Sequence, residues 1–530
     1  MKNKKVKNFL IFIYLICAKH SFSQAYTILP GEEKVYSKEE GLIFKDYLEA
    51  DDKAVYINRG ASDEKAVQIN RVVPHEKETT EIINKIGLYD ISNTSGQTAV
   101  INRIKKKDQM SEETILQKTI YNNKVLAICR RIHLKEKKID LYLKYIEFDG
   151  LEKENRSQLL LASINDTDNK DVFYKFKAFF SPDKSKIFIK QTIYTYKKAT
   201  YSWIVNGWIF ETSNAKKLSE FSVPRFQDKL ELEVDDIFIS NNGNVFCSSR
   251  IPKDTSTEIE RISTPNTPKS PLSPTIFYLN LNQNSFKSIK LSDLPINFQD
   301  FKLKEVNESV YAYGSLFNKS NKSFEIFYAK MDIKSEKITE FSSVRLTPAI
   351  SSKLKVAPLS ILRSDKLILD GENVFVICQN TYVHSYSGTG GIFHEILDRD
   401  LIIGKFNKEN TNQQINLIPK NTGPLLKNYH VYTKKGALYV VYVEHPKNLE
   451  DYTLENYDPE KYNMIVNYNG SVSVCTKIST DGTMKRESLF ENKGWCFKPE
   501  NLDIVIEKEN ALILHMIKGK KERFDKLIIR

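Results

Sequence analysis

One short pattern recurs along this 530-residue chain and constrains its fold more than any other feature. In residues 179–190, FFSPDKSKIFIK, two runs of alternating apolar and polar residues flank the tripeptide Ser-Pro-Asp. Alternation with a period of two is typical of β-strands. Pro182 presets the backbone for a turn, and the Asp183 side chain can bond back to the backbone. The stretch therefore predicts a β-hairpin.

The hairpin belongs to an internal repeat. Similar strand–turn–strand patterns recur at a spacing of roughly 60 to 75 residues, which indicates a repeat architecture. Together with residues 179–190, the predicted hairpins are residues 118–129, 236–247, 301–314, 367–378, 430–443 and 503–516.

A second strand–turn–strand element follows in most repeats, so each unit contains about four antiparallel strands. These second elements are residues 145–161, 208–223, 277–291, 327–341, 402–418 and 472–490. A unit of this size cannot bury both of its faces alone, whereas radial stacking buries them. We therefore predict an all-β fold, a β-propeller of seven four-stranded blades over residues 115–530.

The hairpin sequences are similar to those of a known repeat class. FSPD at 180–183, followed by KIFI, resembles the turn of β-propeller repeats of the WD40 and TolB-like kinds, and FISNNGNVF at 238–246 is a looser copy. Lys184 stands where that class prefers glycine, and the Gly-His and Trp-Asp signatures of true WD40 repeats are absent from the sequence. The resemblance therefore implies the fold and no particular activity.

Both ends of the chain have a predicted place in or beside the ring. The last repeat supplies about three strands and ends in a strand within residues 519–530, although this basic end also faintly resembles bacterial sorting domains. A strand at Ala25–Leu29 is predicted to complete that blade. The rest of the small mixed N-terminal segment, residues 24–114, contains a predicted strand pair (53–59 and 65–71) and a helix at Glu78–Leu88. It is either an extra blade or a cap.

The first 23 residues have the three-part plan of a secretory signal peptide. Four lysines among residues 2–7 precede the apolar run Phe9–Ala18, and Ser21-Phe22-Ser23 offers small residues before Gln24. The apolar run is shorter than the ~20 residues that span a bilayer. We predict export to the periplasm, the outer membrane or the medium, with no transmembrane segment.

Net charge and cysteine content limit which partners and cross-links are expected. The chain has a formal charge of +12, and removing residues 1–23 leaves +7. Its basic residues are spread among nearly as many acids, which favours a solvated surface over a nucleic-acid groove. Five cysteines then remain without a CxxC motif, and the four in apolar runs (Cys129, Cys247, Cys378 and Cys475) are predicted to be buried and unpaired.

Four long connections between the second and third strands of a blade are the candidate binding elements, because function tends to lie on long loops of a rigid scaffold. They are residues 191–202, 250–275, 380–396 and 444–463, and we expect them to rise from one face around the central channel. Tyrosines offer a rigid apolar body with a polar tip. The candidate binding residues are Tyr194, Tyr196, Tyr201, His384, Tyr386, His394, His445, Tyr452 and Tyr457.

A search for known catalytic and cofactor-binding motifs finds no clear site in the sequence. His384, His394 and His445 offer three imidazoles for a metal, but three unrelated loop histidines are the simpler interpretation. The glycine-rich SGTGG lacks the ending of a phosphate-binding loop, and the chain has neither a GxSxG nor an HExxH motif. We therefore expect no cofactor.

These features favour a monomeric, non-catalytic binding or scaffold module of the cell envelope, with a protein or a glycan as its partner. The alternative is a propeller hydrolase or lyase acting on polysaccharide or peptide. Two carboxyl groups or three imidazoles converging on the long-loop face would favour the enzyme.

Overall fold

The computed structural model describes most of the chain between Tyr26 and Arg530. The longest stretches outside the description are residues 1–25, 73–97, 103–110, 148–157, 224–235 and 252–272, and shorter ones lie in connecting segments. The predicted helix at Glu78–Leu88 and the predicted signal peptide fall outside the described residues.

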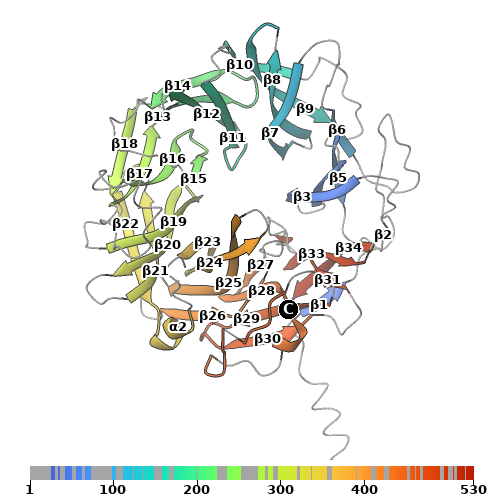
Figure 1. Cartoon of the computed structure of the whole chain (residues 1–530), viewed down its shortest axis with the longest axis vertical. Helices are drawn as coiled ribbons and strands as arrows, with labels where there is room; N and C mark the ends of the chain where they lie inside the picture. The colour runs from blue at the N-terminus through green and yellow to red at the C-terminus, as the bar shows by residue number, and fades with distance from the viewer. Residues whose placement is uncertain are drawn as a thin grey trace, which may run out of the picture.

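Antiparallel sheets follow one another around a ring in chain order (Figure 1). Seven of them are four-stranded: β3 to β6 (Leu42–Ala50, Val55–Ala61, Ala66–Val72, Thr98–Asn102), β7 to β10 (Ser111–Tyr121, Lys124–His133, Lys138–Glu147, Gln158–Asn165), β11 to β14 (Val172–Phe180, Lys186–Lys197, Thr200–Glu211, Lys217–Val223), β15 to β18 (Asp236–Ile239, Val245–Ile251, Ser273–Asn280, Ser285–Lys290), β19 to β22 (Ile296–Val306, Ser309–Asn318, Ser323–Asp332, Lys337–Arg345), β23 to β26 (Ile361–Asp370, Asn373–Gly388, Gly391–Asn407, Gln414–Ile418) and β27 to β30 (His430–Lys434, Ala437–Glu444, Val472–Ile478, Met484–Ser488).

The remaining sheet joins the two ends of the chain. It contains β31 (Cys496–Phe497), β32 (Val505–Ile506), β33 (Ala511–Lys518), β34 (Lys521–Ile529), β1 (Tyr26–Leu29) and β2 (Lys34–Val35). Strand β1 pairs antiparallel with β34, and Tyr26 lies opposite Ile529. The predicted closing strand and the predicted final strand are both confirmed.

The chain is therefore a β-propeller, as predicted. Each of the seven predicted hairpins is an antiparallel strand pair: β7–β8, β11–β12, β15–β16, β19–β20, β23–β24, β27–β28 and β32–β33. The N-terminal segment adds a further sheet, β3 to β6, in which the predicted pair appears as β4 and β5. It lies beside β7 in the ring, as an extra blade would (Figure 1).

The SPD turn that opens the repeat is built as its residues predict. The Ser181 hydroxyl donates to Asp183 Oδ1 at 2.6 Å, and the Ser185 N–H donates to the same oxygen at 3.0 Å. Lys184 adopts the left-handed region with φ 62°, which explains why related turns prefer glycine there. The Asp183 N–H also donates to Asn241 Oδ1 at 2.9 Å, so the turn contacts its counterpart in the next blade.

Hydrophobic clusters lie between consecutive sheets rather than within one. Leu141 and Phe210 share a cluster between the second and third sheets. Tyr328 and Phe406 pack edge to face with ring centroids 5.0 Å apart. At Gly404 a Cβ atom would meet Ile326 Cγ2 of the preceding sheet at 2.9 Å, so only glycine allows this approach. Radial stacking therefore buries both faces of the blades.

Cysteines behave as the sequence predicts wherever they are described. Cys129, Cys378, Cys475 and Cys496 are buried and form no disulfide with one another. The Cys247 side chain lies outside the description.

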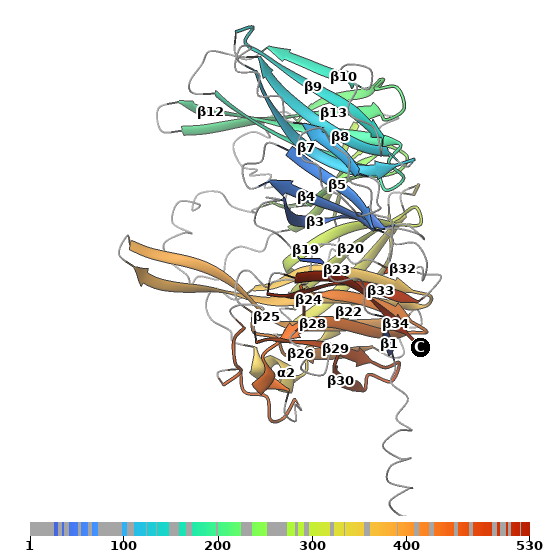
Figure 2. The same ribbon diagram turned by 90° about the vertical axis from the view of Figure 1, so that its right-hand side faces the viewer.

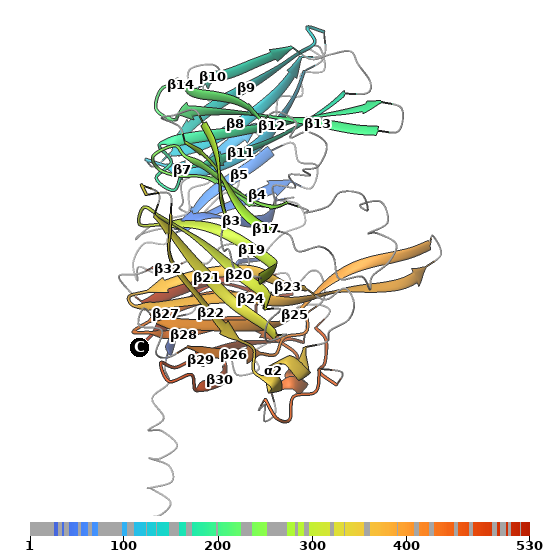
Figure 3. The ribbon, with the colours of Figure 1, turned by 90° about the vertical axis from the view of Figure 1, so that its left-hand side faces the viewer.

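The long connections that the structure describes lie on one side of the ring. Two of them, predicted as loops, are instead continuations of strands: β12 and β13 run on to Lys197 and Thr200, and β24 and β25 run on to Gly388 and Gly391. Alternating Tyr, Thr, Ile and Val residues keep these segments in strand conformation. Figures 2 and 3 show both hairpins projecting from the same side of the ring. Most of residues 250–275 lies outside the description.

Candidate functional site

A pocket of about 550 Å3 lies where two connecting segments meet on the long-loop side. One is the short helix α2 (Pro348–Lys353), which follows β22, and the other is the segment between β28 and β29. We refer to residues 445–465 of that segment as the strap. Figure 1 places α2 at the outer edge of the ring, so this pocket is a rim pocket and does not lie at the channel mouth that the sequence predicted.

Helix α2 forms where the sequence provides both start signals of a helix. The Thr347 hydroxyl accepts a hydrogen bond from the Ile350 N–H at 3.2 Å, and Pro348 takes the first helical position. Ile350 and Leu354 are buried in the cluster that also contains Tyr457 of the strap. This packing fixes the helix end against the strap and so sets the width of the pocket.

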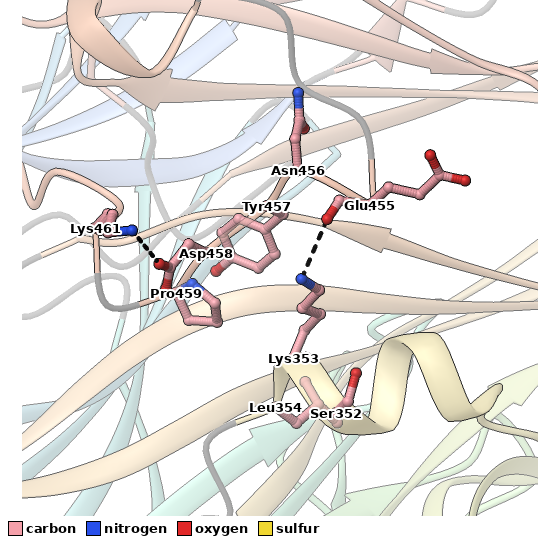
Figure 4. Close-up of a pocket in the computed structure, with 9 residues that line it drawn as sticks. All are labelled: Ser352, Lys353, Leu354, Glu455, Asn456, Tyr457, Asp458, Pro459 and Lys461. Carbon is pink, nitrogen blue, oxygen red and sulfur yellow. Dashed lines mark hydrogen bonds and ion pairs between the residues drawn. The ribbon is translucent and has the colours of Figure 1, made fainter.

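The rim pocket is lined by polar groups of both signs around a tyrosine and a proline (Figure 4). The Lys353 ammonium donates to the Glu455 carbonyl at 3.4 Å, and Lys461 pairs with Asp458 at 3.2 Å. In Figure 4 the Glu455 side chain points away from Asp458. The full lining is Ser352, Lys353, Leu354, Glu455, Asn456, Tyr457, Asp458, Pro459 and Lys461.

Tyr457 connects the pocket to a buried charged group of the neighbouring blade. Its hydroxyl donates to Asp400 Oδ1 at 2.5 Å, and the Lys420 N–H donates to the same oxygen at 3.3 Å. The Arg399 guanidinium donates to the Pro459 carbonyl. Two adjacent residues of β25 therefore hold the pocket-lining part of the strap.

A second buried cluster holds the two ends of the strap together. Glu444, at the end of β28, has no exposed side-chain surface and pairs with Arg486 of β30 at 2.6 Å. The Tyr462 hydroxyl donates to Glu444 Oε2 at 2.6 Å, and Asn448 Nδ2 donates to Oε1 at 2.7 Å. Asn448 also accepts from the Asn463 N–H at 3.0 Å. Charge and hydrogen bonds therefore fix the described residues near both ends of the strap to the blade.

The pH dependence of stability should report on Asp400. Burial raises the pKa of Asp400, although Tyr457, Arg399 and Lys420 act in the opposite direction. A carboxyl whose pKa is raised on folding stabilises the folded state below its ordinary pKa, and this contribution is lost as the pH rises through the raised value. An asparagine retains the oxygen that accepts from Tyr457. We expect the free energy of unfolding of Asp400→Asn to match or exceed that of the wild type at pH 8. Between pH 5 and pH 8 it should fall by less than that of the wild type.

Urea unfolding at several pH values measures this effect. The companion variant Tyr457→Phe removes a donor from the buried carboxylate, so it should lower the free energy of unfolding by about 1.5–3 kcal/mol at pH 8 and by less at pH 5. An Asp400→Asn variant that lost equal stability at both pH values would contradict the assignment.

The predicted histidines are not brought together by the described geometry. In the register of β24 and β25, His384 lies opposite Glu395, and His394 lies opposite Ser385. Opposed residues share a face of a hairpin and neighbours along a strand alternate, so the two histidines hold positions on opposite faces. His445 caps the short helix η2 (Pro446–Asn448), where its Nδ1 accepts from the Lys447 N–H at 3.2 Å. Within the described part of the chain, no group of three His, Cys, Asp or Glu side chains is placed to hold a metal.

The predicted tyrosines divide into two groups. Tyr194, Tyr196 and Tyr201 lie on the β12–β13 hairpin, and Tyr386 lies on the β24–β25 hairpin. Tyr457 lines the rim pocket, but its side chain is only 3% exposed because the ring packs inward. Tyr452 falls outside the described residues.

Sequence reasoning missed the charged residues that build this region. Asp398-Arg399-Asp400 is a charged triplet inside the apolar strand β25, and Glu444 directly follows the apolar run VVYV. Charges inside an apolar run are a usable signal for a buried polar network, because a buried charge must be paired. Lys353, Asp458 and Lys461 had no comparable signal.

Comparisons with known proteins assign no family to the chain. The sequence matches no protein-family model and no curated protein. The chain is similar to the β-propeller domain of the Trilobed protease from Pyrococcus furiosus, with 10% identity, 86% of this chain and 97% of that chain covered, and a TM-score of 0.34. It is similar to the acylaminoacyl peptidase of Pyrococcus horikoshii, with 9% identity, 78% and 59% covered, and a TM-score of 0.31. For the WD40 domain of SCAP from fission yeast these values are 9% identity, 78% and 96% covered, and a TM-score of 0.23.

Proposed function

We propose that the protein is an exported, monomeric β-propeller of the cell envelope that binds a glycan or protein partner through its long-loop side without catalysis, with the rim pocket as a contact point. The observation that carries this proposal is a preformed pocket of about 550 Å3, fixed by buried anchors on two blades. Pockets of this size accommodate small ligands, and fixed polar groups give them specificity. The basic, apolar and small-residue segments of residues 1–23 support export. No helix in the described part of the chain has the length and apolar character needed to cross a membrane.

The lining favours a glycan unit over an apolar ligand. Ser352, Asn456 and Lys353 offer donors, while Glu455 and Asp458 offer acceptors. Pro459 adds apolar surface between these groups, whereas Tyr457 is almost fully buried. Each hydroxyl of a sugar can both donate and accept hydrogen bonds, which matches a lining that offers donors and acceptors.

The alternative, a hydrolase or lyase, requires carboxyl groups free to act on a substrate. Asp400 and Glu444 are both fully buried, and their oxygens accept from Tyr457 and Arg486. In the pocket, Asp458 is paired with Lys461, and Glu455 is directed away from it (Figure 4). This arrangement supports binding more than acid–base catalysis, which needs a positioned acid and base.

The test is co-sedimentation of the mature protein with isolated envelope polysaccharide, with soluble glycan fragments as competitors. The variant Asn456→Ala/Asp458→Ala removes an amide and a carboxylate from the pocket and is expected to weaken binding by about tenfold or more, a loss of ~1.4 kcal/mol. Lys461→Ala should weaken binding as well.

The matched control is Lys334→Ala. Lys334 is 88% exposed and pairs with Glu308 at 3.9 Å, as the 86% exposed Lys461 pairs with Asp458, but it lies in a β21–β22 turn on the other side of the ring. Equal losses in both lysine variants would reject the pocket as the site. Release of new reducing ends by the wild type, abolished in Asp458→Asn, would establish the enzyme instead.

A further inference from the structure

The first strand of each four-stranded sheet stands at the end of its sheet and lies nearest the centre of the ring (Figure 1). We refer to six of these strands, β7, β11, β15, β19, β23 and β27, as the inner strands. Phe176 of β11 shares a hydrophobic cluster with Leu141 of the preceding blade, and Leu303 of β19 shares one with Phe246 of the preceding blade. Because side chains alternate along a strand, the residues between them face the following blade.

Lysines on this second face repeat from blade to blade. The Lys304 ammonium of β19 donates to the Leu367 carbonyl of β23 at 2.9 Å. The Lys366 ammonium of β23 donates to the Tyr429 carbonyl, directly before β27, at 3.1 Å. In both contacts the partner lies 63 residues further along the chain. Lysine side chains of the inner strands therefore lie along the inner wall of the ring.

The exposed charges of the inner strands have one sign. Among the described residues of these strands, four charged side chains are exposed, and all four are cationic: Lys175 and Lys177 on β11, Lys304 on β19 and Arg363 on β23. Lys175, Lys177 and Arg363 form no hydrogen bond or ion pair with another described side chain or backbone group. Because Lys175 and Lys177 lie in the middle of β11 on either side of buried Phe176, solvent reaches them from the centre of the ring.

Acids of the same strands do not cancel this charge at the surface. The acids with described side chains, Asp300, Glu305, Asp365 and Asp370, are all partly buried. The Ser364 N–H donates to Asp300 Oδ2 at 2.5 Å, and the Gly436 N–H donates to Asp370 Oδ2 at 2.7 Å. The charge that the described wall presents to solvent is therefore positive.

We propose that this inner wall binds an acidic polysaccharide, a polymer of sugars that carry carboxylate groups, at a site separate from the rim pocket. Lys175 and Lys177 are about 6.6 Å apart along one face of β11, so an extended polyanion can contact both. The Arg363 guanidinium can hold a carboxylate with two parallel hydrogen bonds. The cations come from three different blades, and a polymer can contact them together, whereas a small anion cannot.

The inner wall favours a polysaccharide over a nucleic acid. Proteins that bind single-stranded nucleic acids combine a cationic groove with exposed aromatic rings on which the bases stack. No aromatic side chain is exposed in the described part of the inner strands. The wall thus offers charge without a surface for base stacking.

The test is titration of the mature protein with fluorescently labelled polygalacturonate, with neutral dextran of the same length for comparison. We expect binding of polygalacturonate and none of dextran. Raising the ionic strength from about 0.05 M to about 0.5 M shortens the Debye length roughly threefold and should weaken binding by about tenfold or more. Binding of dextran equal to that of polygalacturonate, or no binding of polygalacturonate, would overturn the proposal.

Charge-neutral variants locate the site. Lys175→Gln/Lys177→Gln should weaken binding of polygalacturonate by about tenfold, equivalent to ~1.4 kcal/mol. Arg363→Gln should weaken it as well, and Arg363→Lys, which keeps the charge, should restore part of the loss. These side chains are exposed, so thermal unfolding of the variants should match that of the wild type.

The matched control is Lys216→Gln/Lys217→Gln, which removes the same charge from the same blade at its outermost strand, β14 (Figure 1). The Lys217 side chain is 53% exposed. This control should bind polygalacturonate as the wild type does. Equal losses in the control and in Lys175→Gln/Lys177→Gln would mean that net charge alone drives binding, and would overturn the proposal.

Two further measurements separate the competing sites and ligands. The pocket variant Asn456→Ala/Asp458→Ala leaves the inner wall intact and should still bind polygalacturonate, so either proposal can fail without the other. A loss confined to that pocket variant would assign the polymer to the rim pocket and overturn the inner-wall site. Tighter binding of single-stranded DNA than of polygalacturonate, lost in Lys175→Gln/Lys177→Gln, would overturn the choice of ligand.

Discussion

Replacing Arg486 with leucine should lower the free energy of unfolding by about 3–5 kcal/mol, because it leaves the Glu444 carboxylate buried in the protein interior without its counter-ion. The Arg486 guanidinium donates to Glu444 Oε2 at 2.6 Å and to the Asn448 carbonyl at 3.0 Å. A single substitution therefore removes both the charge partner and a direct contact to the strap. Chemical unfolding of the full mature chain measures the loss.

The loss should depend on pH in a defined direction. Burial raises the pKa of Glu444, and Arg486 is the largest opposing influence. Without Arg486 the folded-state pKa rises further above the unfolded value. The contribution of the Glu444 carboxyl to the free energy of unfolding is then fully present only below its unfolded-state pKa. This contribution is lost as the pH rises through the raised pKa of the folded state. The variant should be closer to wild type at pH 5 than at pH 8.

Two companion variants make the interpretation specific. Lys485→Leu alters the preceding residue of β30, which is 58% exposed and pairs with Glu487 at the surface, and should change stability by less than about 1 kcal/mol. Glu444→Gln/Arg486→Leu removes the buried charge together with its partner and should recover part of the loss. A pH-independent loss, or no recovery in the double variant, would contradict this role.

The sequence predicts the scaffold well because the scaffold is periodic. Alternating strands around turn residues such as Asn307 or Asp370-Gly371 are local signals, and each one reappears as a hairpin. Because the hairpins recur at a nearly even spacing, they also predict the repeated blades of the ring. Ring closure by Ala25–Leu29 is predictable because the last repeat lacks a strand.

The rim pocket was not predictable for the opposite reason. Its parts come from α2 and from the strap, about 100 residues apart in the sequence, as the contact between Lys353 and Glu455 shows. Glu444 and Arg486 are 42 residues apart in the sequence, and the residues around each of them give no signal that the two side chains pair. Side-chain pairs of this kind depend on how blades and loops pack, which a one-dimensional pattern does not encode.

The extended hairpins illustrate a different limit. Residues 191–202 and 380–396 contain the alternating Tyr, Thr, Ile and Val of strands, but they also contain Lys-Lys, Ser-Gly and Gly-Gly, which are typical of loops. Composition favoured loops, whereas cross-strand pairing in the structure favours strands. The length of a hairpin beyond its sheet is set by both strands together, so a single segment does not fix it.

Deletion of residues 25–29 should destabilise the whole ring, because β1 supplies the outer strand of the last sheet. Four residues of β1 pair with β34, and Ile28 packs against the cluster that contains Leu527 and Ile529. At about 1 kcal/mol for each hydrogen bond and a further contribution from Ile28, the expected loss is about 3–5 kcal/mol. The deletion should also make β33 and β34 sensitive to proteases, since removal of a closing strand permits local opening. Unchanged unfolding and proteolysis would mean that β1 does not stabilise the ring.

A circular permutant isolates this contribution from the position of the chain ends. Because Tyr26 lies opposite Ile529, an Asn-Gly turn can join Arg530 to Ala25 and convert β34 and β1 into a continuous hairpin. New ends placed between Asn102 and Ser111 leave strands β6 and β7 intact. The permutant should unfold with at least the wild-type free energy, because the closing strand is now covalently tethered. If the permutant folds but is as unstable as the deletion, pairing of β1 with β34 contributes nothing, and the ring must be held by the contacts between sheets alone.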